Sequence, residues 1–396
     1  MRYNTRRWNP LLIAVPDIGI GVFWALSGTV APWIIYEHTK SNFEAMLIMS
    51  MGAFTGIFMQ IISGILSDQS KFSQKWGKRT PWILGGVIIA SITMILWSLV
   101  PNYWSLFIIA FITYSAVNFY QGPYYTMIME VVDNDQIGYA NSLARTTAQI
   151  GATAISFVSS LIYLKFGSFM TCIIIALFLI IPTFLVLPNI IKERPENIRT
   201  VEKYKLGFHF IHYPRVVQLF LATFCFFAGY SCLVPLLTPY FVNYLHFNKE
   251  SISYAMTIYA ASSIVYGIFA SHVNDKFNRH KVYLLAISSF FIVFISGNFI
   301  QSSHLALYIF MGACGITFLA TQIAIYTLLP EISPRERLGE FQGWLNMFIS
   351  LSQFMMMIIM GYVMDHGGAK YLYPIGSAIV FLAIILMLPK LNNNHN

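Results

Sequence analysis

The sequence predicts an all-α membrane protein with twelve transmembrane helices, arranged as two six-helix bundles related by a pseudo-two-fold axis. Composition is the first observation: the 396-residue chain is 57% hydrophobic and 10% charged, whereas soluble proteins carry about 25% charged residues. The second is a series of apolar runs, each long enough to cross about 30 Å of hydrocarbon. The third is that the second half of the chain repeats the first.

The repeat is clearest between residues 121–138 and residues 322–339. Without a gap, an offset of 201 aligns five identical residues: Gln121, Tyr125, Thr126, Glu130 and Gly138 with Gln322, Tyr326, Thr327, Glu331 and Gly339. Upstream, an offset of 207 aligns Pro32 with Pro239 and Asp68 with Asp275. Two similar apolar halves are typical of a transporter whose site lies between them.

The apolar runs follow one another with short interruptions, which set the limits of the expected helices. They are residues 10–36, 45–66, 81–100, 103–130, 138–164, 167–189, 214–243, 250–272, 281–301, 304–330, 340–364 and 368–389. The one long polar segment, 190–213, follows the sixth run. We therefore expect a first bundle over 1–189, a cytoplasmic linker over 190–213 and a second bundle over 214–396. Part of the linker is either a short amphipathic helix on the membrane surface or a solvated connection.

Lysine and arginine gather in alternate loops, which predicts the orientation in the membrane. The loops on one side have only Lys40, Lys165, Lys249 and Lys370, and the loops on the other side hold the rest of the assigned basic residues. Because basic loops stay in the cytoplasm, both termini are expected there, in the cell (inner) membrane. The net charge of +8 is thus explained by topology, and we expect the lipid bilayer, not nucleic acid, as the partner of a monomeric protein.

Two related loops carry the next signal. Residues 64–81 read GILSDQSKFSQKWGKRTP, and residues 271–281 read SHVNDKFNRHK. This pattern resembles the loop between the second and third helices of the major facilitator superfamily. The resemblance implies that the loop aspartate caps a helix of the other half and that the basic residues bind carboxylates. The residues expected to form this cytoplasmic gate are Asp68, Lys78, Arg79, Asp275, Arg279, Glu331 and Arg335. Alternatively, these charges only set the topology.

Four further segments narrow the resemblance: GVFWAL at 21–26, WGKRTPWIL in the 64–84 region, QGP at 121–123 and GWLNMFISLSQ at 343–353. Together they resemble the sucrose-transporter-like branch of the glycoside–pentoside–hexuronide:cation symporters. The chain departs from plant sucrose transporters at two places. Tyr125 stands where they have an arginine, and Tyr114 matches the position of their proton-carrying aspartate. These departures argue against sucrose as the substrate and against proton coupling at the position that plant sucrose transporters use.

In the fold that the resemblance implies, the first, fourth, seventh and tenth helices line a central cavity. Sugar recognition needs amides, which donate and accept hydrogen bonds, and aromatic faces for the apolar side of the ring. Polar and aromatic residues near the middle of these helices and of their neighbours are the expected substrate contacts: Trp24, Asn118, Gln121, Gln149, Tyr230, Thr321, Gln322, Asn346 and Gln353. The competing interpretation for each polar residue is an interhelical hydrogen bond.

Charges inside the expected spans are rare and expensive, so they point to function. Asp17 and Arg145 each lie seven residues into a helix that starts in the cytoplasm, which puts both about 10 Å deep. We hypothesise that they pair and that protonation of Asp17 releases Arg145 during transport. Glu130 is the alternative partner of Arg145. A purely structural ion pair is the other interpretation.

The sequence carries no hydrolase, kinase or metal-site signature and no phosphate-binding glycine loop. We therefore expect a transporter, not an enzyme, with no cofactor. Its energy source is a gradient of protons or of sodium ions, and we take the proton as the coupling ion. The leading hypothesis is a proton-coupled importer of a small solute, a sugar or glycoside, that works by alternating access. The alternative is a proton-coupled exporter of a drug, a siderophore or another metabolite. A receptor or scaffold that transports nothing would require an appended soluble domain, which the sequence does not predict.

Overall fold

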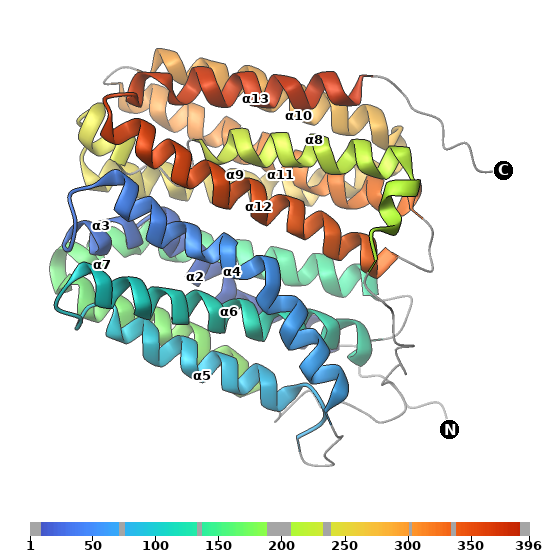
Figure 1. Ribbon diagram of the computed structural model, residues 1–396, viewed down its shortest axis with the longest axis horizontal. Coiled ribbons are helices and arrows are strands. Elements are labelled where there is room, and N and C mark those ends of the chain that lie inside the picture. The colour runs from blue at the N-terminus through green and yellow to red at the C-terminus, as the bar shows by residue number, and fades with distance from the viewer. Residues whose placement is uncertain are drawn as a thin grey trace. The chain divides into compact units, whose positions relative to one another are not determined.

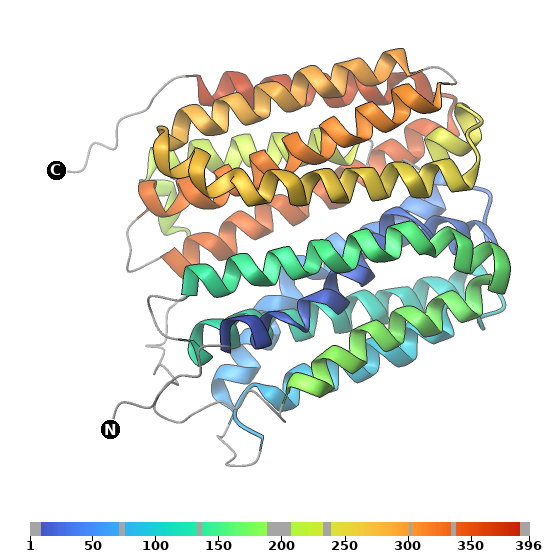
Figure 2. The same ribbon diagram turned by 180° about the vertical axis from the view of Figure 1, so that it is seen from behind.

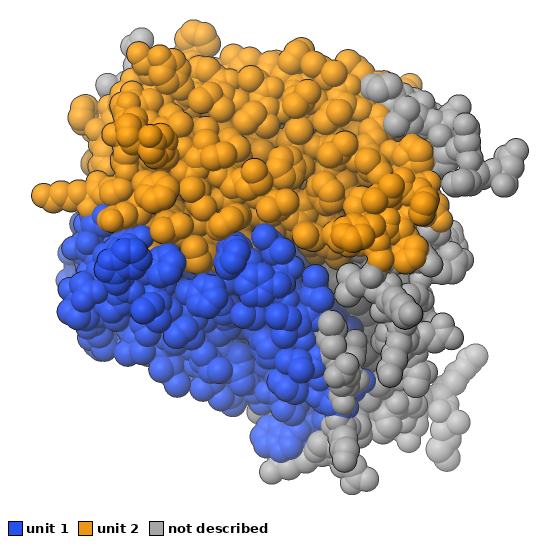
Figure 3. Space-filling model, viewed as in Figure 1, with its two compact units in different colours: residues 1–39, 54–204 blue, residues 40–53, 205–396 orange. Residues whose placement is uncertain are grey.

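The computed structural model describes residues 9–70, 76–132, 137–187, 207–232, 239–300, 303–333 and 338–388, and every regular element within them is a helix (Figure 1, and from behind in Figure 2). The chain forms two compact units, shown in Figure 3. Unit 1 comprises residues 1–39 and 54–204, and unit 2 comprises residues 40–53 and 205–396. The all-α prediction is confirmed, and helices occupy each of the expected membrane segments.

Unit 1 contains helices from the first half of the chain. They are α1 (Asn9–Ala14), α2 (Asp17–Gly28), α3 (Ala31–Tyr36), the later part of α4 (Asn42–Gln69), α5 (Thr80–Leu96), α6 (Tyr103–Val131) and α7 (Ile137–Val186). The segment expected as one helix over 10–36 is divided into α1, α2 and α3. Pro16 stands directly before α2 and Pro32 lies in the first turn of α3. Proline has no amide hydrogen to donate and clashes with the preceding turn, so helices break there.

The long helix α7 is two helices joined at Gly167, whose φ of +76° and ψ of −177° are not helical. Positive φ is open to glycine because it has no Cβ. The break falls between the two segments expected over 138–164 and 167–189, so a single glycine lets the chain leave one span and enter the next without a longer loop.

Unit 2 contains the start of α4 and the second half of the chain. Its elements are η2 (His209–His212), α8 (Pro214–Ser231), η4 (Pro239–Tyr244), α9 (Lys249–Lys276), α10 (Arg279–Ser296), η5 (Gly297–Phe299), α11 (His304–Ile332), α12 (Leu338–Asp365), η7 (Ala369–Tyr371) and α13 (Leu372–Met387). Residues 40–53, which sequence analysis groups with the first bundle, cluster with unit 2 because the start of α4 is bound by the end of α12.

The helix limits reproduce the sequence repeat. Helices α4 and α9 both have 28 residues and are related by an offset of 207 at both ends. Helices α6 and α11 both have 29 residues and are related by an offset of 201 at both ends. Equal length and equal offset mean that residues 201 or 207 positions apart occupy the same turn of equivalent helices, which permits a residue-by-residue comparison of the two halves.

Within the described residues, seven helical segments are long and apolar enough to cross a membrane. They are Asn42–Gly64, Tyr103–Ile128, Leu161–Val186, Arg279–Phe299, His304–Leu329, Gly343–Asp365 and Ala369–Met387. Two more apolar helical segments, Pro10–Leu26 and Thr80–Leu96, are shorter. The described helices at the other expected spans do not combine sufficient length with a sufficiently apolar sequence.

Candidate functional site

Asp17 begins α2 and is 1% exposed. One carboxylate oxygen, Oδ1, accepts a hydrogen bond from the Tyr125 hydroxyl at 3.4 Å. The other oxygen, Oδ2, is buried and has no hydrogen-bond partner among the described residues. A buried carboxylate is expensive unless it is paired or protonated, so this oxygen is suited to take up a proton or to accept a bond from a ligand.

Tyr125 lies between Asp17 and Arg145. Its hydroxyl faces Asp17, and the guanidinium carbon of Arg145 lies 5.1 Å from the centroid of its ring, within the range of a cation–π contact. The two charged residues that sequence analysis pairs therefore share one aromatic neighbour. Glu130, the alternative partner of Arg145, has its side chain outside the described residues.

The close packing of α2 on α7 brings this group together. A Cβ at Gly21 would lie 1.8 Å from the backbone oxygen of Ala148, and a Cβ at Gly151 would lie 2.2 Å from that of Ile18. Small residues at such crossings let helix backbones approach closely in membranes. The Thr147 hydroxyl also donates to the Ala14 backbone oxygen at 2.8 Å, which fixes the start of α7 beside the α1–α2 break.

A cluster of amides lies on the neighbouring part of α6. The Gln60 Nε2 of α4 donates to Asn118 Oδ1 at 3.1 Å and to Gln121 Oε1 at 3.3 Å. Asn118 Nδ2 donates in turn to Thr55 Oγ1 at 3.0 Å and to the Tyr114 backbone oxygen at 3.1 Å. Both amide hydrogens of Asn118 and its oxygen are thus engaged, so this residue holds the cluster in shape.

Gln60 and Gln121 each keep an unused group. The Gln121 nitrogen and the Gln60 oxygen make no hydrogen bond to a described residue. A donor on one amide and an acceptor on the amide bonded to it match the two roles of a hydroxyl group. Because Asn118, Gln121 and Tyr125 follow one another at helical spacing on α6, the amides and the Asp17 group share one helix face.

Aromatic residues border the same helix. The Trp24 ring stacks on Tyr114 with centroids 6.0 Å apart and planes at 25°, and Tyr114 also contacts Trp97 at 5.8 Å. Tyr114, which matches the aspartate position of plant sucrose transporters, is 1% exposed. It supports Trp24, which is a half-buried residue.

Unit 2 presents a less polar set of candidates. Tyr230 stacks on Phe318 with centroids 4.2 Å apart, and its hydroxyl lies 3.2 Å from that of Tyr259. The Tyr326 hydroxyl donates to Asn346 Oδ1 at 3.1 Å. Thr321 donates to the backbone of its own helix, at Thr317, at 2.9 Å. The remaining expected contacts, Gln149 of unit 1 and Gln322 and Gln353 of unit 2, are half-buried, and their side chains make no hydrogen bond to a described residue.

The residues of the expected gate are only partly described. Arg79 is 1% exposed and donates from Nη1 to Ser67 Oγ at 2.9 Å. Arg279 donates to the Thr327 backbone oxygen at 3.2 Å and lies 3.8 Å from Glu331, with side chains 40% and 48% exposed. The side chain of Lys78 is half-buried. The side chains of Asp68, Asp275 and Arg335 lie outside the described residues.

Comparison with known proteins decides the family. The sequence model of the Major Facilitator Superfamily matches residues 18–216 and 219–395. The chain belongs to the Major Facilitator Superfamily. A crystal structure of a mutant of the nucleoside transporter NupG is similar in fold, with a TM-score of 0.79, 13% sequence identity and coverage of 96% of this chain and 99% of that chain. No curated protein matches the sequence.

Membership of the superfamily confirms the predicted fold class and makes the chain a multi-pass membrane transporter of a small molecule, not an enzyme. The membrane setting gives the polar groups of unit 1 their significance, since a buried carboxylate and a four-residue amide cluster are costly in an apolar protein.

Two members of the amide cluster, Gln60 and Thr55, were not among the expected site residues. The signal that finds them is the amide of Gln60 in the middle of the apolar run 45–66. Its side chain bonds Asn118 and Gln121 together, so the second helix of the superfamily fold contributes to the candidate site of this chain.

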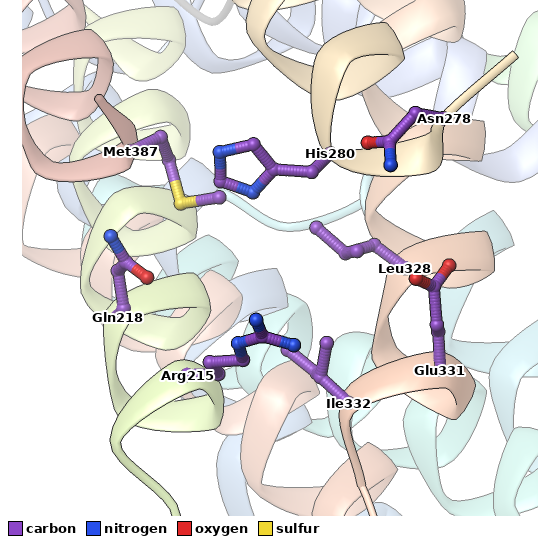
Figure 4. Close-up of a pocket in the computed structure, with 8 residues that line it drawn as sticks. All are labelled: Arg215, Gln218, Asn278, His280, Leu328, Glu331, Ile332 and Met387. Atoms are coloured by element: carbon purple, nitrogen blue, oxygen red, sulfur yellow. The ribbon is translucent and has the colours of Figure 1, made fainter. Parts of the chain in front are cut away.

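A pocket of unit 2 lies at the ends of α8, α10, α11 and α13, and Figure 4 shows the side chains that line it. It has a volume of about 90 Å³. Arg215 and His280 point into it from two helices, and Glu331 borders it on a third. Apart from Glu331, none of the expected gate or substrate residues lines it.

Proposed function

We propose that this transporter moves a small hydroxyl-bearing solute, a sugar or glycoside, by proton-coupled symport with alternating access. The observation that carries the proposal is the arrangement on one face of unit 1. There, the partly unsatisfied carboxylate of Asp17 stands next to Tyr125, and the Gln60–Gln121 amides follow one helical turn away.

Asp17 is the proposed proton carrier. Its carboxylate is 1% exposed, and one oxygen has no hydrogen-bond partner among the described residues, so an uncompensated charge there is costly. Arg145 favours the charged form through its position on the other side of Tyr125. A change in the distance between Arg145 and Asp17 during the cycle would therefore switch the carboxylate between its two forms.

The amides and Trp24 are the proposed solute contacts. The free acceptor of Gln60 and the free donor of Gln121 would bind one sugar hydroxyl, and the indole of Trp24 would cover the apolar side of the ring. These features, with the motifs at 21–26 and 343–353, support the sucrose-transporter-like branch of the cation symporters. The monomeric state and the cytoplasmic position of both termini belong to the same proposal.

A nucleoside is the second candidate solute. It also presents ribose hydroxyls, and its base would stack on Trp24. The similar structure is that of a protein described as a nucleoside transporter. Both solutes would use the same donor–acceptor pair. They differ in the aromatic surface that they need, because a nucleoside base requires a larger flat surface beside the sugar than a second sugar ring does.

The test is uptake by the purified protein in liposomes, with a panel of labelled sugars and nucleosides and with or without an inward proton gradient. Saturable accumulation that collapses with a protonophore supports symport, and gradient-driven loss of solute from preloaded liposomes would support export instead.

In Asp17→Asn, gradient-driven accumulation should fall at least tenfold, and solute exchange should be retained. Glu250→Gln, which removes an exposed carboxylate in the first turn of α9, is the control. Full gradient-driven uptake by Asp17→Asn would disprove the coupling role.

A further inference from the structure

The start of α4 is bound by a residue that comes 323 positions later in the chain. Asp365, the last residue of α12, accepts from the backbone nitrogen and the side-chain nitrogen of Asn42 through Oδ1, both at 2.8 Å. Through Oδ2 it accepts from the Ser41 hydroxyl at 2.6 Å and from the Phe43 nitrogen at 2.9 Å. Each oxygen of one carboxylate therefore holds two donors.

This contact is a helix cap supplied from a distance. The first amide groups of a helix have no partner within it, and the positive end of the helix dipole favours a carboxylate. The usual cap is the residue just before the helix. Both repeats follow that rule. In α9, Asn248 accepts from the Ser251 nitrogen at 2.7 Å, and in α4 the Ser41 hydroxyl oxygen accepts from the Glu44 nitrogen at 3.2 Å. Helix α4 differs because it has, in addition to its local cap, a charged cap from another helix.

A second feature places α12 firmly against α4 near this cap. A Cβ added at Gly361, one turn before Asp365, would lie 2.9 Å from the Cβ of Met46 and 3.1 Å from the Asn42 backbone oxygen. The glycine thus allows the two helices to approach closely, and the carboxylate one turn later binds the helix start. Two independent contacts on the same side of α12 define this junction.

Helix α4 also joins the junction to the candidate site. Its residues 40–53 belong to unit 2, and the part after Ala53 belongs to unit 1. That later part supplies Thr55 and Gln60 to the amide cluster. Whatever holds or releases the start of α4 therefore acts on a helix that bears two side chains of the amide cluster three to five turns later.

We propose that Asp365 and the start of α4 form a latch, which is closed in one conformation of the transport cycle and open in another. This inference rests on the proposed function, because it assumes a cycle of alternating conformations. The donors and the carboxylate lie at the surface, so water can replace the four bonds when the latch opens. The charge pattern of the loops places Lys40, and hence this latch, on the outer side of the membrane.

The test is a distance measurement between spin labels at Lys40→Cys and Lys370→Cys, two exposed positions near the junction. The four native cysteines, of which Cys225 is half-buried and the others buried, are replaced by alanine. In liposomes without solute, the parent protein should show a dominant short distance. Asp365→Ala should raise the longer-distance population at least fivefold and change the initial uptake rate at least threefold. Asp365→Asn, which keeps the side-chain volume, is the second variant if the alanine protein does not fold.

The matched control is Asn248→Ala, which removes the local cap of the equivalent helix α9. It should lower thermal stability and leave the distance distribution between the labels unchanged. An unchanged distribution in both Asp365 variants would overturn the latch. The measurement needs no solute, so a shifted distribution in a protein that transports no sugar or nucleoside would overturn the proposed function and leave the latch standing.

Discussion

Two equivalent positions carry different chemistry in the two halves of the chain. Tyr125 and Arg145 of unit 1 correspond, at an offset of 201, to Tyr326 and Asn346 of unit 2. In unit 1 the tyrosine lies between a cation and the buried Asp17. In unit 2 it donates to a neutral amide at 3.1 Å. Both halves therefore place a tyrosine on one helix next to a polar residue on the following helix. That polar residue is charged in unit 1 and neutral in unit 2.

The amide cluster shows the same contrast. Gln60 and Asn118, which are hydrogen-bonded in unit 1, correspond to Gly267 and Leu319 in unit 2. The second pair is also in contact, since a Cβ at Gly267 would lie 3.5 Å from the Leu319 Cδ2. The two helix pairs therefore meet at the same place, with hydrogen bonds in one half and apolar contact in the other.

The helix interfaces differ in a related way. In unit 1, α2 and α7 approach through glycines, as at Gly21, whereas the corresponding α8 and α12 of unit 2 meet through aromatic rings, such as Phe220 and Phe348 at 5.3 Å. Close backbones leave room for few side chains, and rings fill a wider interface. We infer that unit 1 holds the ionisable and hydrogen-bonding chemistry and that unit 2 supplies mainly aromatic surface.

Arg145→Asn, which gives unit 1 the residue of unit 2, should have the largest effect. Loss of the cation beside Tyr125 leaves Asp17 buried without the positive charge of Arg145. We expect kcat/KM for gradient-driven uptake to fall by about 100-fold, or about 2.7 kcal/mol. Lys165→Gln, which removes an exposed cation from the same helix, should behave like the parent. An Arg145→Asn protein with more than half of the parent rate would show that the charge difference between the halves has no function.

Gln60→Leu should have an intermediate effect, because it removes the donor that joins Asn118 and Gln121. Two interhelical hydrogen bonds at about 0.6 kcal/mol each correspond to about an eightfold change. We expect this change chiefly in KM for uptake, since the cluster is a proposed solute contact. The corresponding variant of unit 2, Gly267→Ala, fits the available space and should leave KM unaltered. Equal KM values for both variants would remove the amide cluster from the site.

The features that follow local rules could be predicted from the sequence. Apolar runs gave the helices, and the offsets of 201 and 207 gave equivalent helices of equal length. The common neighbourhood of Asp17 and Arg145 was also accessible, because charge is rare inside a span and both residues lie at the same depth. In each case the signal resides in residue type and spacing alone.

Contacts between distant segments could not be predicted in this way. The sequence does not reveal which face of 45–66 meets α6, so Gln60 was not among the expected site residues. The bonds of Asp365 to Asn42 and Phe43 join residues over 320 positions apart, and no spacing rule relates them. The breaks at Pro16 and Pro32 fall inside the run expected as one helix over 10–36, because whether a proline bends or ends a helix depends on what surrounds it.

Tyr326→Phe should have the smallest effect and gives the sharpest version of the comparison. It removes one hydroxyl that donates to a neutral amide, and a single bond of this kind is worth about 0.6 kcal/mol in a membrane, or about a threefold change in uptake. Tyr125→Phe removes the equivalent hydroxyl from a carboxylate that is 1% exposed, where bonds to charged groups are worth about 1.5–3 kcal/mol. We therefore expect the unit 1 variant to lose at least tenfold in initial rate under a proton gradient, and the unit 2 variant at most threefold.

Because both substitutions delete the same atom at the same turn of equivalent helices, any difference between them reports the environment of the hydroxyl. Two equal losses would mean that the halves share the work of coupling in spite of their different charges.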